Sequence, residues 1–113
     1  MDKSRVALGR WGERRVARHY QDAGYELLSH HWQIKGGELD LVLGRGNEIV
    51  FCEVKTRSSQ RFGSGWEAVG YRQQGTLRRT AMAWLASHGR RGSLRFDVAV
   101  VSQNGIEVCE GAF

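Results

Sequence analysis

Apolar and polar residues alternate along the chain with two periods, one typical of helices and one typical of strands. Apolar residues at helical spacing over residues 4–23 predict a first helix, and Gly24 marks its end. Three strand-like runs follow, at residues 25–32, 38–43 and 48–55, and a Gly-Arg-Gly-Asn turn between the last two predicts a hairpin. The first half of the chain is therefore expected to form a helix and three strands.

The second half is expected to add a helix and two strands. A helical stripe that includes Trp84 runs through at least the second half of residues 66–88, and strand-like runs follow at residues 94–101 and 106–109. A long helix between strands usually joins parallel neighbours in one sheet. The pattern predicts an α/β fold with a mixed sheet flanked by helices, and the length of 113 residues fits a single domain, residues 1–113.

The central hairpin carries charged residues whose facing decides whether they can act together. Residues two apart in a strand share a face, so Glu53 and Lys55 point the same way. Asp40 lies on that face as well if residue 40 pairs with residue 53, or in any register whose paired numbers have an odd sum. The same register joins six apolar residues in one core face: Leu39, Leu41, Leu43, Val50, Cys52 and Val54. We therefore expect the odd register.

A half-buried cluster of Asp40, Glu53 and Lys55 carries a desolvation cost that a structural role alone rarely justifies. Neighbouring carboxylates raise each other's pKa, and a divalent cation such as Mg²⁺ removes their repulsion. Such a cation polarises phosphoryl oxygens and activates water, and Lys55 would orient that water or neutralise charge on the phosphate. The cluster predicts phosphodiester hydrolysis, and the alternative is a structural ion-pair network.

The composition favours a polyanionic partner. Lys and Arg number 17 against 12 Asp and Glu, which gives a formal net charge of +5. This excess suits DNA or RNA, although a solvated basic surface explains it equally well. No apolar run is long enough to span a membrane, so we expect a cytoplasmic protein without a membrane segment. Cys52 and Cys109 lie in strand-like runs, which predicts reduced thiols rather than a disulfide.

Three motifs resemble the YraN family of bacterial proteins: Gly12-Glu13, the Gly-Glu-Leu-Asp-Leu run at 37–41, and the Phe-Cys-Glu-Val-Lys-Thr-Arg run at 51–57. The resemblance spans nearly the whole chain. That family is similar to the restriction-endonuclease-like superfamily, which includes archaeal Holliday-junction resolvases and shares a core of helix, three strands, helix and strand. The resemblance therefore implies a restriction-endonuclease-like sheet and a nuclease acting on DNA, including branched or repair-related DNA.

The resemblance also implies roles for individual residues. Asp40, Glu53 and the backbone carbonyl of Val54 would bind Mg²⁺ or Mn²⁺, Lys55 would be the catalytic lysine, and Glu13 would complete the acidic set. Glu13 also shares a helical face with apolar residues and is expected to point inward. Related resolvases act as symmetric dimers, so the resemblance allows a homodimer.

Two positions depart from the family pattern. Gln73 stands where similar proteins often carry a lysine early in the second helix, and His31 stands where an asparagine usually precedes Trp32. The first departure keeps open a non-catalytic nucleic-acid-binding module with the nuclease fold. His30 and His31 are adjacent in a predicted strand and should face opposite sides, which makes them poor joint metal ligands.

Most of the other charged residues allow two interpretations, one functional and one structural. Arg57 follows the Glu-Val-Lys motif and would bind phosphate, or else is a solvated loop arginine. Arg78 and Arg79 would bind nucleic-acid backbone, or else form the ordinary polar face of an amphipathic helix. Glu38 is expected to support the site rather than to form it. Asp97 either reaches the site or is a hydrogen-bonded structural aspartate.

Overall fold

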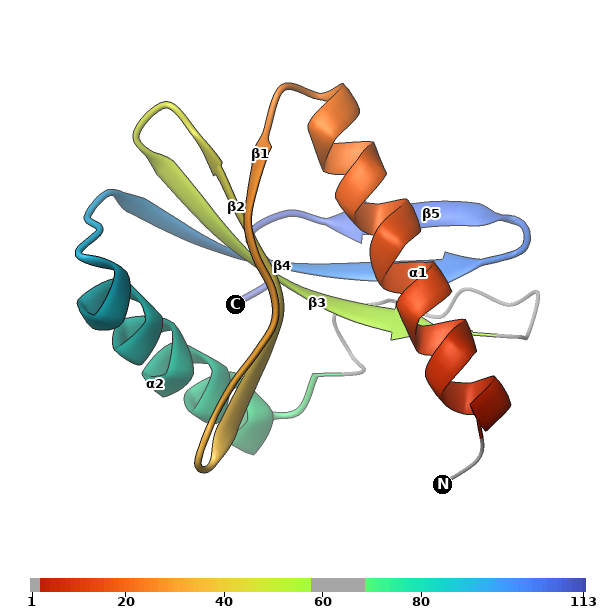
Figure 1. The fold of residues 1–113 in the computed structure, drawn as a ribbon, viewed down its shortest axis with the longest axis horizontal. Helices are drawn as coiled ribbons and strands as arrows, with labels where there is room; N and C mark the ends of the chain where they lie inside the picture. Colours follow the sequence, from red (N-terminus) through yellow and green to blue (C-terminus); the bar gives the residue numbers. More distant parts are fainter. Residues whose placement is uncertain (1–2, 58–68) are drawn as a thin grey trace.

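The computed structural model describes residues 3–57 and 69–113, with side chains from residue 6 onward. Its elements follow one another in the predicted order (Figure 1). They are α1 (Lys3–Asp22), β1 (Glu26–Ile34), β2 (Gly37–Arg45), β3 (Glu48–Thr56), α2 (Tyr71–His88), β4 (Ser93–Ser102) and β5 (Gly105–Cys109). The predicted α/β class and the order of helices and strands are thus confirmed.

The five strands form one mixed sheet with the spatial order β1-β2-β3-β4-β5. The first three strands form an antiparallel meander, and β4 and β5 are also antiparallel. Strand β3 pairs with β4 in parallel, and the chain between them includes α2, as the long predicted helix requires.

The helices cover opposite faces of the sheet (Figure 1). Helix α1 packs on a cluster that its own apolar stripe shares with the strands: Val16, Ala17, Tyr20, Leu41, Leu43, Val50, Cys52, Ala99 and Val101. Helix α2 closes a second cluster on the other face: Leu39, Val42, Ile49, Phe51, Leu77, Ala81, Trp84 and Val98. Because both faces are covered, the middle of each central strand is buried: residues 41–43 of β2 and residues 49–52 of β3.

Helix α2 begins at Tyr71, later than the start of the helical stretch considered from the sequence, and residues 66–68 lie outside the described part of the chain. Trp84 is fully buried as predicted, and its indole nitrogen donates a hydrogen bond of 2.9 Å to Ser29 Oγ on β1. The helix ends at Gly89, whose left-handed φ of 60° costs a glycine little.

The central hairpin has the odd register. Leu41 pairs with Cys52 and Val42 with Phe51, so the paired numbers add to 93. The prediction that six apolar residues share one face is wrong for Leu39. This residue packs in the cluster under α2, whereas Leu41 packs in the cluster under α1. Strand β2 pairs with β3 only from Leu41 to Arg45, and its earlier residues 37–39 pair with β1 alone. The strict alternation of side chains between the two faces of the sheet is therefore lost just before Leu41.

The two cysteines are free, with Cys52 buried and Cys109 half-buried, as predicted. Within the described residues, no helix has the length and apolar character to cross a membrane.

Candidate metal centre

The centre lies where β2 separates from β3. Asp40 directly precedes Leu41, whose pair with Cys52 is the last one between β2 and β3 at this end of the hairpin. The backbone amide of Val54 on β3 donates a hydrogen bond of 2.9 Å to Asp40 Oδ2. A side-chain oxygen therefore accepts the hydrogen bond that a backbone carbonyl would accept in a continuous ladder. This bond fixes the Asp40 carboxylate at the point where the two strands diverge.

Glu53 lies beside Asp40, with 13% of its side chain exposed. Burial, followed by a hydrogen bond to Asp40 and the charge of Asp40, raises the pKa of Glu53 to about 9. The ammonium group of Lys55 lies 3.9 Å from Glu53 Oε1 and offsets only part of this effect. The structure thus brings together the two acids and the amine that the sequence predicts, and burial together with Asp40 favours the protonated form of the Glu53 carboxyl group.

Glu13 reaches the same region from α1. A Cβ atom at Gly12 would lie 2.8 Å from Val101 Cγ1 and still closer to Thr56 Oγ1, so only a glycine lets α1 approach the sheet this closely. The side chain of Glu13 is 20% exposed, and burial and then the charge of Asp40 raise its pKa. Gly12 in the Gly-Glu motif therefore positions the acid that follows it.

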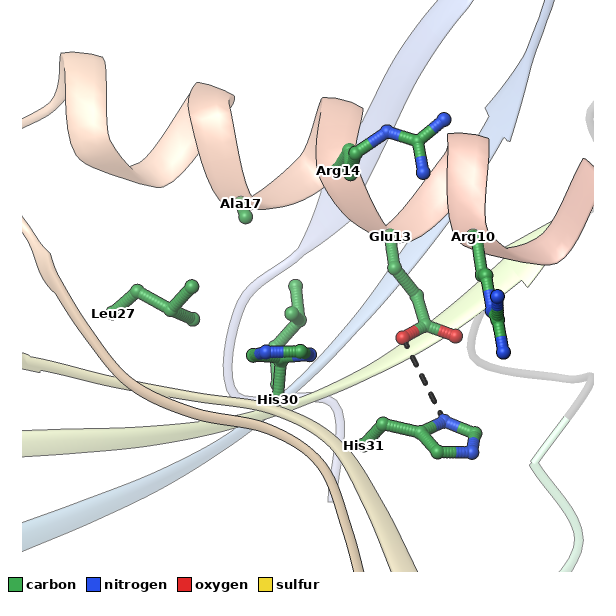
Figure 2. A pocket seen from close by; sticks show the side chains of 8 residues that line it. Arg10, Glu13, Arg14, Ala17, Leu27, His30 and His31 are labelled. Carbon is green, nitrogen blue, oxygen red and sulfur yellow. Dashed lines mark ion pairs between the residues drawn. The ribbon is translucent and has the colours of Figure 1, made fainter. Parts of the chain in front are cut away.

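His31 is the residue that the sequence did not assign to the site. Its Nδ1 lies 3.9 Å from Glu13 Oε1 (Figure 2) and 3.3 Å from Glu38 Oε1. One ligand atom each from Glu13, His31 and Asp40 lie within 4.8 Å of one another, so these three residues could hold a metal ion. Carboxylate oxygens and an imidazole nitrogen are suitable ligands for divalent metals.

The prediction that His30 and His31 face opposite sides is wrong, because both line the same cavity (Figure 2). His31 has a φ of 51°, in the left-handed region, and this conformation breaks the alternation of the strand. The numbers of the flanking pairs, His30 with Leu41 and Trp32 with Leu39, both add to 71, which places His31 opposite Asp40. The sequence carried no signal for this, since the β1–β2 register depends on an irregularity between Leu27 and Ser29.

Glu38 supports the centre from the outside. It is exposed, and its two carboxylate oxygens contact His31 Nδ1 and the amide nitrogen of Gln33, the latter at 3.1 Å. Gln33 Nε2 also lies 3.4 Å from His31 Nε2. These contacts restrain the imidazole ring, in agreement with a supporting role for Glu38.

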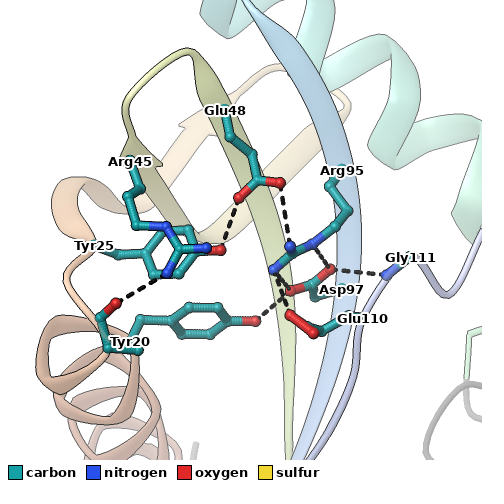
Figure 3. A network of polar contacts seen from close by, with 9 residues as sticks. Tyr20, Tyr25, Arg45, Glu48, Arg95, Asp97, Glu110 and Gly111 are labelled. Atoms are coloured by element: carbon teal, nitrogen blue, oxygen red, sulfur yellow. Dashed lines mark hydrogen bonds and ion pairs between the residues drawn. The ribbon is translucent and has the colours of Figure 1, made fainter.

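Asp97 does not reach the centre. It is fully buried in a separate polar network, where it accepts hydrogen bonds from Tyr20, Arg95 and the amide of Gly111 (Figure 3). Arg95 also pairs with Glu48 at 3.2 Å. Asp97 is therefore a structural aspartate, the second of the two alternatives open from the sequence.

The predicted nucleic-acid contacts lie outside the centre. Arg57 directly follows β3 and is exposed, and its backbone amide donates to the carbonyl of Val101 at 2.8 Å. Arg78 and Arg79 are exposed on α2, where the Arg78 guanidinium lies 5.3 Å from the centre of the Phe113 ring. Gln73 lies one turn before Leu77, which lines a small pocket together with Asp40 and Glu53.

Known proteins resemble this chain over nearly its whole length. Residues 12–101 match the model of a family described as Uncharacterised protein family UPF0102. A UPF0102 protein of Frankia casuarinae is 47% identical over 117 aligned positions, which cover 98% of this chain and 99% of the relative. A UPF0102 protein of Moorella thermoacetica is 42% identical over 120 positions, which cover 100% of both chains. The YraN-like resemblance is thereby confirmed, and the chain belongs to the UPF0102 family.

Proposed function

We propose that the chain is a Mg²⁺- or Mn²⁺-dependent endonuclease that hydrolyses phosphodiester bonds of DNA. The observation that carries the proposal is the carboxyl pair of Asp40 and Glu53 at the divergence of β2 and β3, with Lys55 3.9 Å from Glu53. Two half-buried acids with one nearby amine are an unfavourable arrangement unless a cation joins them. Natural selection retains such an arrangement most readily for chemistry.

Each residue of the centre has a distinct proposed role. Asp40, Glu53 and the backbone carbonyl of Val54 would hold the cation, as the family resemblance implies, and Glu13 from α1 and His31 from β1 offer further ligand atoms close to Asp40. A bound divalent cation stabilises negative charge on the phosphoryl oxygens and lowers the pKa of a coordinated water.

Lys55 is proposed to contact the substrate phosphate rather than the cation. Its side chain is 19% exposed, so its ammonium group can reach a phosphate while its stem stays packed. It orients the attacking water or neutralises the charge that develops on the phosphate. Because the pKa of Glu53 is raised, we expect a cation bound by this carboxylate to compete with a proton.

The choice of DNA rests on charge and on family resemblance. A formal net charge of +5 favours a polyanion, and Arg57, exposed directly after β3, is available to bind phosphate. Branched and repair-related DNA are proposed substrates because the motifs resemble those of Holliday-junction resolvases.

A second candidate function follows from Gln73. This residue lies one turn before Leu77, which lines a small pocket with the carboxyl pair, and it stands at the position where similar proteins often carry a lysine. A glutamine supplies no positive charge to a phosphate, which favours a module that binds nucleic acid without cutting it.

Cleavage assays separate the two functions. The purified protein is incubated with linear, flapped and four-way-junction DNA, with Mg²⁺, Mn²⁺ or a chelator. The proposed enzyme cuts only with metal, and Asp40→Asn and Glu53→Gln each reduce the rate by about 100-fold or more. Glu107→Gln, which alters an exposed carboxylate on β5, is the matched control and should cut at the wild-type rate. Binding without cutting under every condition would contradict the enzyme and support the module.

A further inference from the structure

A cavity of about 490 Å³ lies between α1 and the β1–β2 hairpin (Figure 2). Its helical side consists of residues spaced i, i+3, i+4 and i+7 along one face of α1: Arg10, Glu13, Arg14 and Ala17. Its strand side consists of Leu27, His30, His31 and Leu41. Glu13 and His31 belong to the metal centre as well, so the cavity opens directly beside it.

The cavity combines an apolar interior with a cationic rim. Ala17, Leu27 and Leu41 supply the apolar surface. Arg10 and Arg14 are exposed, and neither forms an ion pair or hydrogen bond with another residue of the described ranges. Two guanidinium groups that have no such partner among residues 3–57 and 69–113, beside an apolar slot, fit a ligand that is flat and apolar at one end and anionic at the other.

A nucleotide has this chemistry. Unpaired bases enter apolar pockets and stack on histidine rings or guanidinium planes, and both groups are present in His30 and the rim arginines. The volume lies within the roughly 300–1,000 Å³ that is typical of small-molecule pockets. A base held here would keep its own phosphate at the arginine rim and the adjoining phosphate near Glu13 and His31.

We propose that this cavity binds an unpaired nucleobase from a nucleotide adjoining the bond that is cut. The inference rests on the proposed function, because the base is placed relative to the bond that the neighbouring metal centre would cut. It names the substrate class: DNA with unpaired nucleotides at the cleavage point, such as a flap, a branch point or a single strand. A continuous duplex is disfavoured, since its bases must first leave the stack at a cost in free energy.

Binding of single strands with a missing base tests the cavity directly. Short oligonucleotides with one abasic residue, moved through each position in turn, are titrated by fluorescence anisotropy in chelator, so that no strand is cut. We expect one position at which the missing base weakens binding by about tenfold, the effect of losing one stacked base. A fully paired duplex should show no such position.

Matched leucine variants connect the effect to the cavity. Leu27→Trp fills the interior and should remove the sensitivity to the missing base. Leu94→Trp, at an exposed leucine beside the end of α2, should retain it. Because a tryptophan at position 27 also threatens packing, Arg14→Ala is a second variant on the exposed rim, and it should weaken binding of the intact strand.

The outcomes distinguish this inference from the proposed function. Equal affinity for every abasic strand overturns the base-binding cavity, even if metal-dependent cutting is observed. An abasic-sensitive position that Leu27→Trp does not affect overturns the location. Base discrimination without cutting in any metal supports the cavity but contradicts the nuclease.

Discussion

Glu53 lies near the carboxylate of Asp40 and the ammonium group of Lys55, and Asp40 has the larger effect of the two on the pKa of Glu53. Burial and the neighbouring Asp40 raise its pKa to about 9, although Lys55 lies 3.9 Å away. The raised pKa means that the folded protein binds a proton that the unfolded chain releases near pH 4.5. In the absence of metal, this carboxyl group therefore opposes folding over the whole range between those two values.

The first prediction concerns the pH dependence of metal-free stability. As pH rises from about 4.5 to 9, the free energy of unfolding loses up to about 1.4 kcal/mol per pH unit through Glu53. Glu53→Gln keeps the side-chain volume and cannot ionise, so its stability should overtake that of the wild type as pH rises. Urea unfolding in chelator at a series of pH values measures the difference. Parallel stability curves for the two proteins would show that Glu53 has an ordinary pKa.

Individual residues also mark where sequence reasoning succeeded and failed. The facing of Glu53 and Lys55 follows from strand alternation alone, whereas Asp40 lies just past the last β2–β3 pair and is held near them by the hydrogen bond from the Val54 amide. His31 could not be assigned in this way, because its φ of 51° removes the alternation on which the prediction relied. Leu39 was misplaced for a related reason, at the point where β2 leaves β3.

At the scale of elements, two motif glycines set how closely the helices approach the sheet. Gly12 of α1 faces Thr56 and Val101, and Gly37 of β2 faces Thr80 of α2, with no room for a Cβ atom at either position. The sequence shows these glycines beside acidic residues but cannot show which surfaces they meet. Their role depends on contacts between segments far apart in the chain.

The second prediction separates close approach from helix propensity. Gly12→Ala places a methyl group against Thr56 and Val101, so α1 must shift, and the free energy of unfolding should fall by about 1–3 kcal/mol. Gly9→Ala lies on the same helix with no atom near the added methyl group, and should instead stabilise by about 0.5–1 kcal/mol. Urea unfolding of both variants measures these changes. Equal effects of the two substitutions would contradict the close packing at Gly12.

The helices and strands themselves were predictable because each has a clear period and clear ends. Gly24, two residues after α1, and Gly89, directly after α2, have positive φ angles and stand where the sequence places the helix ends. The parallel pairing of β3 with β4 followed from the long helix between them. The extent of β1 was underestimated, because the strand continues through Ile34 to a tight turn at Gly36.

At the scale of the whole molecule, a net basic chain carries an acidic centre. The formal net charge is +5, while Glu13, Asp40 and Glu53 gather at one point of the sheet. A polyanion is attracted by the overall charge but repelled by these acids unless a cation neutralises them. DNA binding should therefore depend both on salt and on divalent metal.

The third prediction is a steep loss of DNA affinity with salt. If about four phosphates are contacted, raising the salt from about 50 to 200 mM should weaken binding by about 100-fold. Arg57→Ala should lower the slope of log affinity against log salt by about 0.9, the value for one phosphate contact. Anisotropy titrations with four-way-junction DNA, whose arms are duplex, in chelator measure both slopes. A salt-independent affinity would contradict an electrostatic interface.

The most direct test of the account is Mn²⁺ binding measured by titration calorimetry at neutral pH. The wild type should bind Mn²⁺ with release of protons, and Asp40→Asn and Glu53→Gln should each weaken binding by about tenfold or more. Asparagine can still accept the hydrogen bond from the Val54 amide, so the strand geometry is preserved. The exposed control Glu107→Gln should bind as the wild type does. Equal Mn²⁺ affinity in all four proteins, or no binding by the wild type, would contradict a metal centre at the divergence of β2 and β3.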